Sequence, residues 1–218
     1  MKRITRIGIM VCMLLNLLSP IHATATMDTE FERFLSFVQG HPQGGTFEMQ
    51  GDMIINADII TNREITIHTN GYQARIEDNI DGDSNVNIDN FNNDDAWGFV
   101  DEENTLTIEG SGKTRPLVYM DTSVSAFGLR IHCTEGTALE IADGEGLYAK
   151  YADKKNGIRA EGENAIGVLN KNPYQEHYYS ASMVDVDIYT NGANSIGVLA
   201  DWFQIEYSRI EVNGAGSK

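Results

Sequence analysis

Cysteine and proline are scarce in this chain, which has two Cys and four Pro among 218 residues. Cys12 lies in an apolar run near the N-terminus, so Cys133 is the single cysteine of the rest of the chain. One thiol cannot form an internal disulfide, which excludes a disulfide-stabilised scaffold. We expect Cys133 to be a small core residue, with an intermolecular bridge as the alternative.

Basic residues are scarce as well. Three of the 16 Lys and Arg residues precede residue 26, where no acidic residue occurs, which leaves 13 against 32 Asp and Glu. The net charge beyond residue 25 is therefore 13 minus 32, or −19. Phosphate binding needs clustered Lys and Arg, so we expect no nucleic-acid partner and no anionic membrane surface. No run beyond residue 25 is apolar enough to span a bilayer, so we expect no membrane insertion of the mature chain.

The N-terminal segment has the three parts of a secretion signal in the expected order. After a basic start, the apolar run from Ile7 to Leu18 is about twelve residues long, whereas a spanning helix needs roughly twenty. Ser19-Pro20 ends the run, and small residues stand at Ala23 and Ala25. We predict a signal peptide over residues 1–25, cleaved after Ala25, with a cut after Ala23 as the alternative. The mature chain is then extracellular or at the cell surface, or in a periplasm.

Helical periodicity is confined to one segment, from Asp28 to Val38. Its apolar residues fall on one face of a helix: Phe31, Phe34, Leu35 and Val38. Asp28 or Thr29 caps its start, and Gly40 and Pro42 end it. We predict that residues 26–43 form an N-terminal capping helix whose apolar face covers the chain next to it.

After Gly44-Gly45 the chain consists of short β-prone runs separated by Gly, Asn or Asp. Many short strands with frequent turn signals indicate a sandwich, a barrel or a β-solenoid. The runs are Thr46–Met49, Asp52–Ile55, Glu64–His68, Val86–Ile88, Thr105–Ile108, Leu117–Met120, Leu129–Ile131, Ala138–Ile141, Leu147–Ala149, Ile166–Leu169, Val184–Tyr189, Ile196–Ala200, Gln204–Glu206 and Ser208–Val212.

Internal repeats favour the solenoid. Residues 162–169 return as residues 192–199, thirty positions later, and the pattern from Ile188 to Ser195 returns from Ile210 to Ser217, twenty-two positions later. A weaker likeness relates residues 146–149 to residues 157–160. Stacked coils explain such repeats, because each coil packs on a near copy of itself and its turns need Gly or Asn in left-handed positions.

Residues 184–200 and 208–217 resemble the passenger domains of autotransporters and related bacterial adhesins, which have the pectin-lyase-like fold. The resemblance is good over residues 128–218 and loose over residues 46–120. It implies an all-β fold, a right-handed single-stranded parallel β-helix over residues 44–218 with a short N-terminal capping helix. An antiparallel β-sandwich is the alternative. The family normally continues for many coils, so we expect a domain truncated at its C-terminal end, with a capping partner or further coils there.

The difference between the two repeat lengths places eight extra residues between Asn170 and Tyr179. Loops on a rigid scaffold commonly carry function, and aromatic rings stack on sugars while His and Tyr bond to hydroxyls. We predict a ligand-binding loop for a glycan, or for a host or bacterial surface protein; the alternative is a loop packed on the coils. Its candidate residues are Tyr174, His177, Tyr178 and Tyr179.

A second candidate loop, from Glu77 to Asp95, is rich in Asp and Asn, whose oxygen atoms are the ligands that calcium prefers. Val86 occupies the position where a calcium loop needs glycine, and Asn92 stands in place of the closing Glu. Calcium is thus the one cofactor that we consider. The alternative is that these side chains form the solvated face of a strand. The candidate ligands alternate along the chain: Asp81, Asp83, Asn85, Asn87 and Asp89.

Few residues in the sequence form a pattern that is typical of a catalytic site. β-Helix hydrolases need clustered carboxylates, but Asp94-Asp95 is a lone pair, and Arg115 is a weak candidate for the basic group of a lyase. Ser195 is explained as a turn residue, and we assign no catalytic residue. We expect a secreted or cell-surface adhesin-like module with a binding or structural role. The alternatives are a polysaccharide-active lyase or hydrolase, and a truncated remnant or structural spacer.

Overall fold

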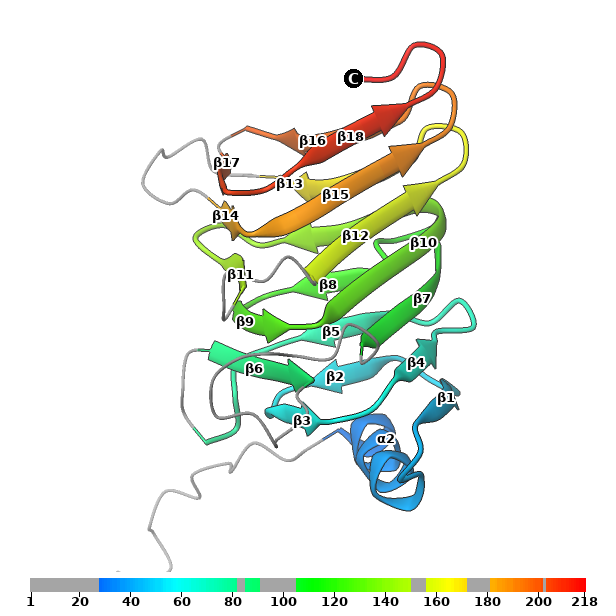
Figure 1. Ribbon diagram of the computed structural model, residues 1–218, viewed down its shortest axis with the longest axis vertical. Helices are drawn as coiled ribbons and strands as arrows, with labels where there is room; N and C mark the ends of the chain where they lie inside the picture. Colours follow the sequence, from blue (N-terminus) through cyan, green and yellow to red (C-terminus); the bar gives the residue numbers. More distant parts are fainter. Residues whose placement is uncertain (1–27, 82–84, 91–104, 150–155, 172–180, 202) are drawn as a thin grey trace, which may run out of the picture.

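The computed structural model describes residues 28–81, 85–90, 105–149, 156–171, 181–201 and 203–218. This part of the chain is mostly β, with one helix and parallel sheets. The prediction of an all-β fold with parallel strands and one helix agrees with this. The strands stack along the long axis of the molecule, from the helix at one end to the last strands at the other (Figure 1).

The strands form three ladders, each with one strand from successive parts of the chain. The first contains β1 (Gly45–Glu48), β4 (Ile65–His68), β7 (Leu106–Gly112), the start of β10 (Leu129–Ile141), β12 (Asn156–Glu161), β15 (Val186–Asn191) and β18 (Ile210–Asn213). The second contains β2 (Met53–Ile55), β5 (Ala74–Ile76), β8 (Val118–Met120), the end of β10, β13 (Ile166–Asn170) and β16 (Ile196–Ala200). The third contains β3 (Ile59–Thr61), β6 (Asn85–Asn90), β9 (Ser123–Phe127), β11 (Gly146–Ala149), β14 (Ala181–Val184) and β17 (Phe203–Glu206).

The chain visits the three ladders in the same order repeatedly, and we call one such passage a coil. β10 serves two ladders of its coil, and its register shifts between Cys133 and Gly136 as it passes from one to the other. All strand pairs in the described ranges are parallel. The antiparallel β-sandwich, which the sequence left as the alternative, does not fit this pairing.

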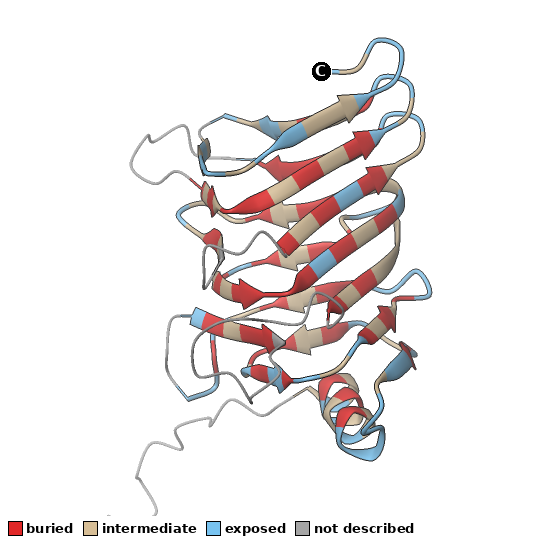
Figure 2. Cartoon of the chain, in the orientation of Figure 1, coloured by how far each residue is buried: buried red, intermediate tan, exposed pale blue. Residues whose placement is uncertain are grey.

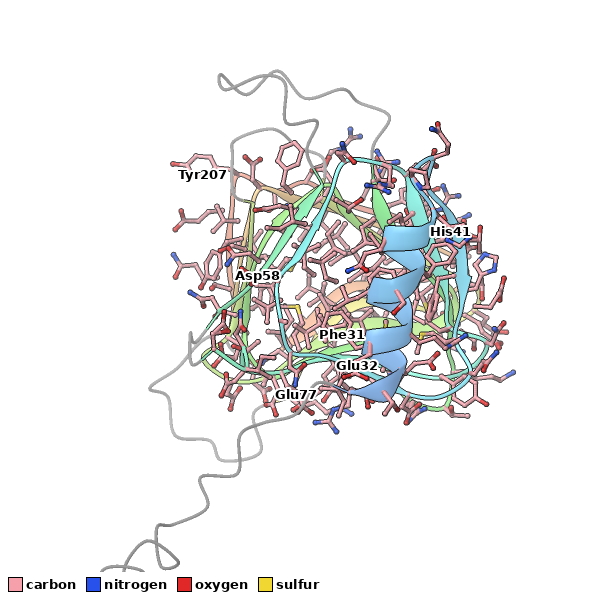
Figure 3. The ribbon with its side chains drawn as sticks, turned by 90° about the horizontal axis from the view of Figure 1, so that it is seen from below. Phe31, Glu32, His41, Asp58, Glu77 and Tyr207 are labelled. Atoms are coloured by element: carbon pink, nitrogen blue, oxygen red, sulfur yellow. The ribbon has the colours of Figure 1, made fainter. Side chains whose placement is uncertain are left out.

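Helix α2 (Thr29–Gly40) closes one end of the stack. The Asp28 side chain caps it by accepting hydrogen bonds from the backbone nitrogens of Glu30 and Phe31. Figure 3 looks at this end, where the helix lies across the strands. Phe31 and Phe34 are fully buried, and the Phe34 ring meets the Phe47 ring of β1 edge-on, with centroids 5.3 Å apart. The structure thus has one helix within the predicted range 26–43, and it ends at Gly40, two residues past the periodic segment that ends at Val38.

The core is a set of apolar columns inside the stack. Along most strands buried and more exposed residues alternate, whereas four successive residues of β13 are buried (Figure 2). In the first ladder five consecutive isoleucines of the inward column, from β4 to β15, are at most 2 % exposed, and each such burial stabilises the fold by roughly 1.5–3 kcal/mol. These residues are Ile67, Ile108, Ile131, Ile158 and Ile188. Inward apolar columns therefore fix which alternate positions of the ladder face outward.

The long repeats in the sequence are coil lengths. Ile166 pairs with Ile196, thirty positions on, and Ile188 pairs with Ile210, twenty-two positions on, as the repeats predicted. The eight extra residues lie where they were expected, because β13 and β14 are separated by residues 171–180 and β16 and β17 by residues 201–202 alone. The likeness between residues 146–149 and 157–160 is not a stacking repeat, since β11 and β12 belong to different ladders.

Glycine recurs at one corner of the stack because coils approach closely there. Gly162, Gly192 and Gly214 have φ values of 97°, 148° and 129°. A Cβ atom on Gly192 would lie 1.9 Å from the carbonyl oxygen of Gly162, and one on Gly214 would lie 2.1 Å from that of Gly192. Asn164 and Asn194, two residues on, have φ values of 59° and 57°, which Asn tolerates better than most residues. The repeated Gly-x-Asn pattern therefore reflects the geometry of this corner.

Cys133 belongs to the core, as the sequence predicted. Its side chain is fully buried and free, and its Sγ donates to the backbone oxygen of Glu135 at 3.0 Å. Burial raises the pKa of the Cys133 thiol, which keeps it protonated and unreactive.

Candidate functional site

The outer face of the first ladder carries the candidate site. Its register aligns outward side chains from neighbouring coils into two columns, which lie two residues apart along each strand. The first column is Thr107, Arg130, Gly157 and Asp187; the second is Glu109, His132, Arg159 and Tyr189. Four consecutive coils thus contribute to one surface.

Gly157 opens a hollow in this surface. The hollow has a volume of about 350 Å³ and is lined by Thr107, Arg130, Ile131, His132, Gly157, Ile158, Arg159, Asp187 and Tyr189. A Cβ atom added to Gly157 would meet only the backbone oxygen of Asp187, at 3.8 Å. The glycine therefore leaves space where every neighbouring coil presents a larger side chain, and the backbone does not require it.

The exposed lining of the hollow is mostly apolar, and Arg130, His132 and Arg159 are the basic residues among those that line it. Arg130 is exposed and makes no ion pair with any described residue. The guanidinium of Arg159 lies 5.2 Å from the centre of the Tyr189 ring, and its Nε donates to Glu161 Oε1 at 2.7 Å. This hydrogen bond is the main cause that lowers the pKa of Glu161. The positive charge of Arg159 is thus partly neutralised by Glu161, whereas Arg130 has no such partner among the described residues.

Asp187 and Tyr189 of β15 line the far side of the hollow. Asp187 pairs in register with Gly157, and its Oδ1 accepts a hydrogen bond from the backbone nitrogen of Arg209 at 3.1 Å. Its Oδ2 makes no hydrogen bond within the described residues, and neither does the Tyr189 hydroxyl. The hollow therefore offers a cation on one side and hydrogen-bonding oxygens on the other.

The second column alternates acid and imidazole over Glu48, His68, Glu109 and His132, and Glu161 lies beside its end. We call these five residues the Glu–His series. His68 Nδ1 lies 3.0 Å from Glu48 Oε1, and its Nε2 lies 3.8 Å from Glu109 Oε2. His132 Nδ1 lies 3.5 Å from Glu109 Oε1, and its Nε2 lies 3.6 Å from Glu161 Oε2. Each histidine thus lies between two carboxylates from other coils, and His132 also lines the hollow.

The aromatic loop that the sequence singled out cannot be compared with this surface. Tyr174, His177, Tyr178 and Tyr179 lie outside the described residues. The link that contains them joins β13 in the second ladder to β14 in the third. Binding by this loop stays a prediction.

The calcium candidates are in part described. Asn85, Asn87 and Asp89 occupy alternate positions of β6, whose intervening residues Val86 and Ile88 are buried. Asn87 donates to Asp58 from its backbone nitrogen at 2.8 Å and from its side-chain amide at 3.1 Å. Asp81 is exposed, and Asp83 falls in the undescribed range 82–84.

A metal site finds no support in the part of the chain that the structure describes, where no three His, Cys, Asp or Glu side chains are grouped so as to hold an ion. Asp83 is not covered by that statement. Calcium at these residues therefore stays a prediction.

The residues weighed for catalysis have structural contacts where they are described. Arg115 forms a two-pronged ion pair with Asp52, with Nη1 2.7 Å from Oδ2, and this hydrogen bonding lowers the pKa of Asp52. Ser195 is fully buried in its turn, and its hydroxyl contacts that of Ser217 at 3.2 Å. The interpretation of Ser195 as a turn residue agrees with this contact. Asp94-Asp95 lies outside the described residues.

Sequence reasoning did not single out the residues of the hollow. The thirty-residue repeat could have aligned Gly157 with Asp187 and Arg159 with Tyr189, since both pairs obey it. The neighbouring coil could not be aligned in this way, because Arg130 pairs with Gly157 at an offset of twenty-seven that no sequence repeat reveals.

Within the described ranges, no helix has both the length and the apolar character needed to cross a membrane. No protein-family model matches the chain, and no match was found among curated proteins or among solved structures.

Proposed function

We propose that this chain is an exported module of a secreted or cell-surface protein, built as a right-handed single-stranded parallel β-helix, and that it binds carbohydrate. Three ladders visited in a fixed order support the β-helix, and crossover connections between parallel strands are right-handed in about 98 % of cases. The signal-like N-terminus and the acidic composition support export.

The observation that carries the binding function is the hollow around Gly157. Its volume of about 350 Å³ lies in the range of small-molecule sites, roughly 300–1,000 Å³. A guanidinium, a carboxylate, a phenol ring and a threonine hydroxyl converge on it, and these groups bond to sugar hydroxyls and pack on sugar rings.

Binding fits this surface better than catalysis. A glycosidase needs two carboxyl groups flanking the scissile bond, and Asp187 is the single carboxylate among the described residues that line the hollow. The adhesin-like role that the sequence resemblance implies is therefore our proposal, ahead of the polysaccharide-active enzyme.

Filling the hollow tests the proposal. Gly157→Leu places a side chain in it without a backbone clash, because the nearest atom to a new Cβ is 3.8 Å away. The matched control is Thr46→Leu, an exposed position of β1 in the same ladder, four coils away from Gly157 on β12. On a glycan array we expect the wild-type chain and the control to bind the same sugars and Gly157→Leu to lose at least tenfold in affinity.

Circular dichroism and urea unfolding would establish that both variants fold. The proposal is wrong if the wild-type chain binds no glycan, or if a folded Gly157→Leu variant binds as tightly as the wild type.

A further inference from the structure

We infer that the sugar bound in the hollow carries a single carboxylate, which Arg130 recognises, and neutral hydroxyl groups at the other side. This inference rests on the proposed function and specifies its ligand class.

The first step is the unpaired cation. Arg130 points outward from β10, is exposed, and has no acidic partner among the described residues, whereas Arg159 on the next strand is paired with Glu161. Five other described arginines each form an ion pair with a carboxylate: Arg33, Arg75, Arg115, Arg159 and Arg209. A guanidinium presents two parallel N–H donors that match a carboxylate, so the available group selects a planar anion.

The second step is the spacing across the hollow. Arg130, Gly157 and Asp187 are consecutive members of one outward column. Strands in a sheet are about 4.8 Å apart, so Arg130 and Asp187 stand roughly 10 Å apart with the glycine between them. One sugar ring with its substituents spans that distance, with its carboxylate at Arg130 and a hydroxyl donating to Asp187 Oδ2.

The third step excludes polyanions. Asp187 and Glu109 flank the cationic groups in the two columns, and the whole chain repels dense negative charge. A heavily sulfated chain would place further anions against these carboxylates. A sugar with one carboxylate and otherwise neutral substituents satisfies both sides of the hollow.

The experiment compares three forms of one oligosaccharide that the wild-type chain binds. These are the carboxylated form, the same form with its carboxyl groups reduced to alcohols, and a sulfated form. We expect the carboxylated form to bind tenfold to a hundredfold more tightly than the reduced form, the range for a charge-assisted hydrogen bond. We expect no gain from sulfation.

Two variants assign this preference to Arg130. Arg130→Gln should lower the affinity for the carboxylated form to that for the reduced form and leave the latter unchanged. The matched charge control is Lys113→Gln, an exposed residue whose Nζ lies 3.2 Å from Glu135, and it should alter neither affinity.

The outcomes separate the two proposals. Equal binding of the carboxylated and reduced forms, with loss of both in Gly157→Leu, would overturn the carboxylate inference and leave carbohydrate binding intact. Stronger binding of the sulfated form, or an unchanged preference in Arg130→Gln, would also overturn it. Failure of the wild-type chain to bind any glycan would overturn both.

Discussion

At the scale of single residues, glycine has two distinct roles in this protein. At Gly192 and Gly214 the backbone adopts positive φ, and the preceding coil leaves no room for a Cβ atom. At Gly157 there is room for a side chain, and its absence creates the hollow. The same residue type is therefore structural at one corner of a coil and functional, on our proposal, in the strand that precedes it.

Alanine substitution should separate these two roles. In Gly192→Ala the new Cβ would clash with the Gly162 carbonyl and the residue would be strained at its φ of 148°. We expect a loss of roughly 2 kcal/mol or more in the free energy of unfolding. Gly157→Ala is the control, and we expect a change below about 0.5 kcal/mol. Urea unfolding measures both; equal losses in the two variants would contradict this account of the corner.

At the scale of elements, the Glu–His series joins coils along the outer face of the first ladder. Arg159 and His132 hold the pKa of Glu161 below its ordinary value, with the Arg159 hydrogen bond as the larger cause. Hydrogen bonds from Asn70 and His68 do the same for Glu48. The ionised carboxylates therefore favour the folded state.

This charge pattern predicts a pH dependence of stability. A carboxyl group with a depressed folded pKa stabilises the fold above its unfolded pKa of about 4.3, and this contribution disappears as the pH falls through the folded pKa. Glu161→Gln should therefore cost about 0.5 kcal/mol at pH 7, the scale of an exposed ion pair, and progressively less between about pH 5 and pH 3.

Urea midpoints measured over this pH range test the expectation. Glu163→Gln, an exposed position in the turn after β12, serves as the control and should leave stability unchanged throughout. A cost of Glu161→Gln that grows as the pH falls would show that the sign is wrong.

Elements also show how far sequence reasoning reaches. The helix and the thirty- and twenty-two-residue registers were predictable, because near copies of a coil must stack on each other. β3, β5, β9 and β12 were missed, and so was β14 apart from Val184. β3 and β5 have only three residues each, and the serines and alanine of Ser123–Phe127 give little strand signal. Val184–Tyr189 was predicted as one strand but is divided between β14 and β15 at Asp185, which has a φ of 60°.

The candidate site was harder to predict than the fold for a physical reason. Its residues come from four strands, and their alignment depends on the length of each intervening link. Because the coils differ in length, the pairing of Arg130 with Gly157 follows no repeat distance in the sequence, although each strand is short and regular. Sequence periodicity identifies the positions that recur from coil to coil. The hollow exists because β12 has a glycine where the neighbouring coils have larger side chains.

At the scale of the whole molecule, the proposed export signal makes a direct prediction. Expressed in full in a bacterium with an intact secretion pathway, the chain should be recovered outside the cytoplasm with Thr26 as its first residue. N-terminal sequencing and intact mass measure this. Ala23→Arg combined with Ala25→Arg should block cleavage, with Thr26→Ser as the control that leaves it intact. Recovery of an uncleaved wild-type chain in the cytoplasm would contradict the prediction.

The direction of the ladders has a mechanical consequence. Backbone hydrogen bonds within a ladder join one coil to the next, so they run along the long axis of the molecule (Figure 1). Each coil contacts chiefly its neighbours, as in other repeat proteins. Tension applied along that axis is therefore resisted by one coil interface at a time, and the molecule yields stepwise, releasing one coil's length of chain with each rupture. Such a module would lengthen under load and dissipate energy between its two ends.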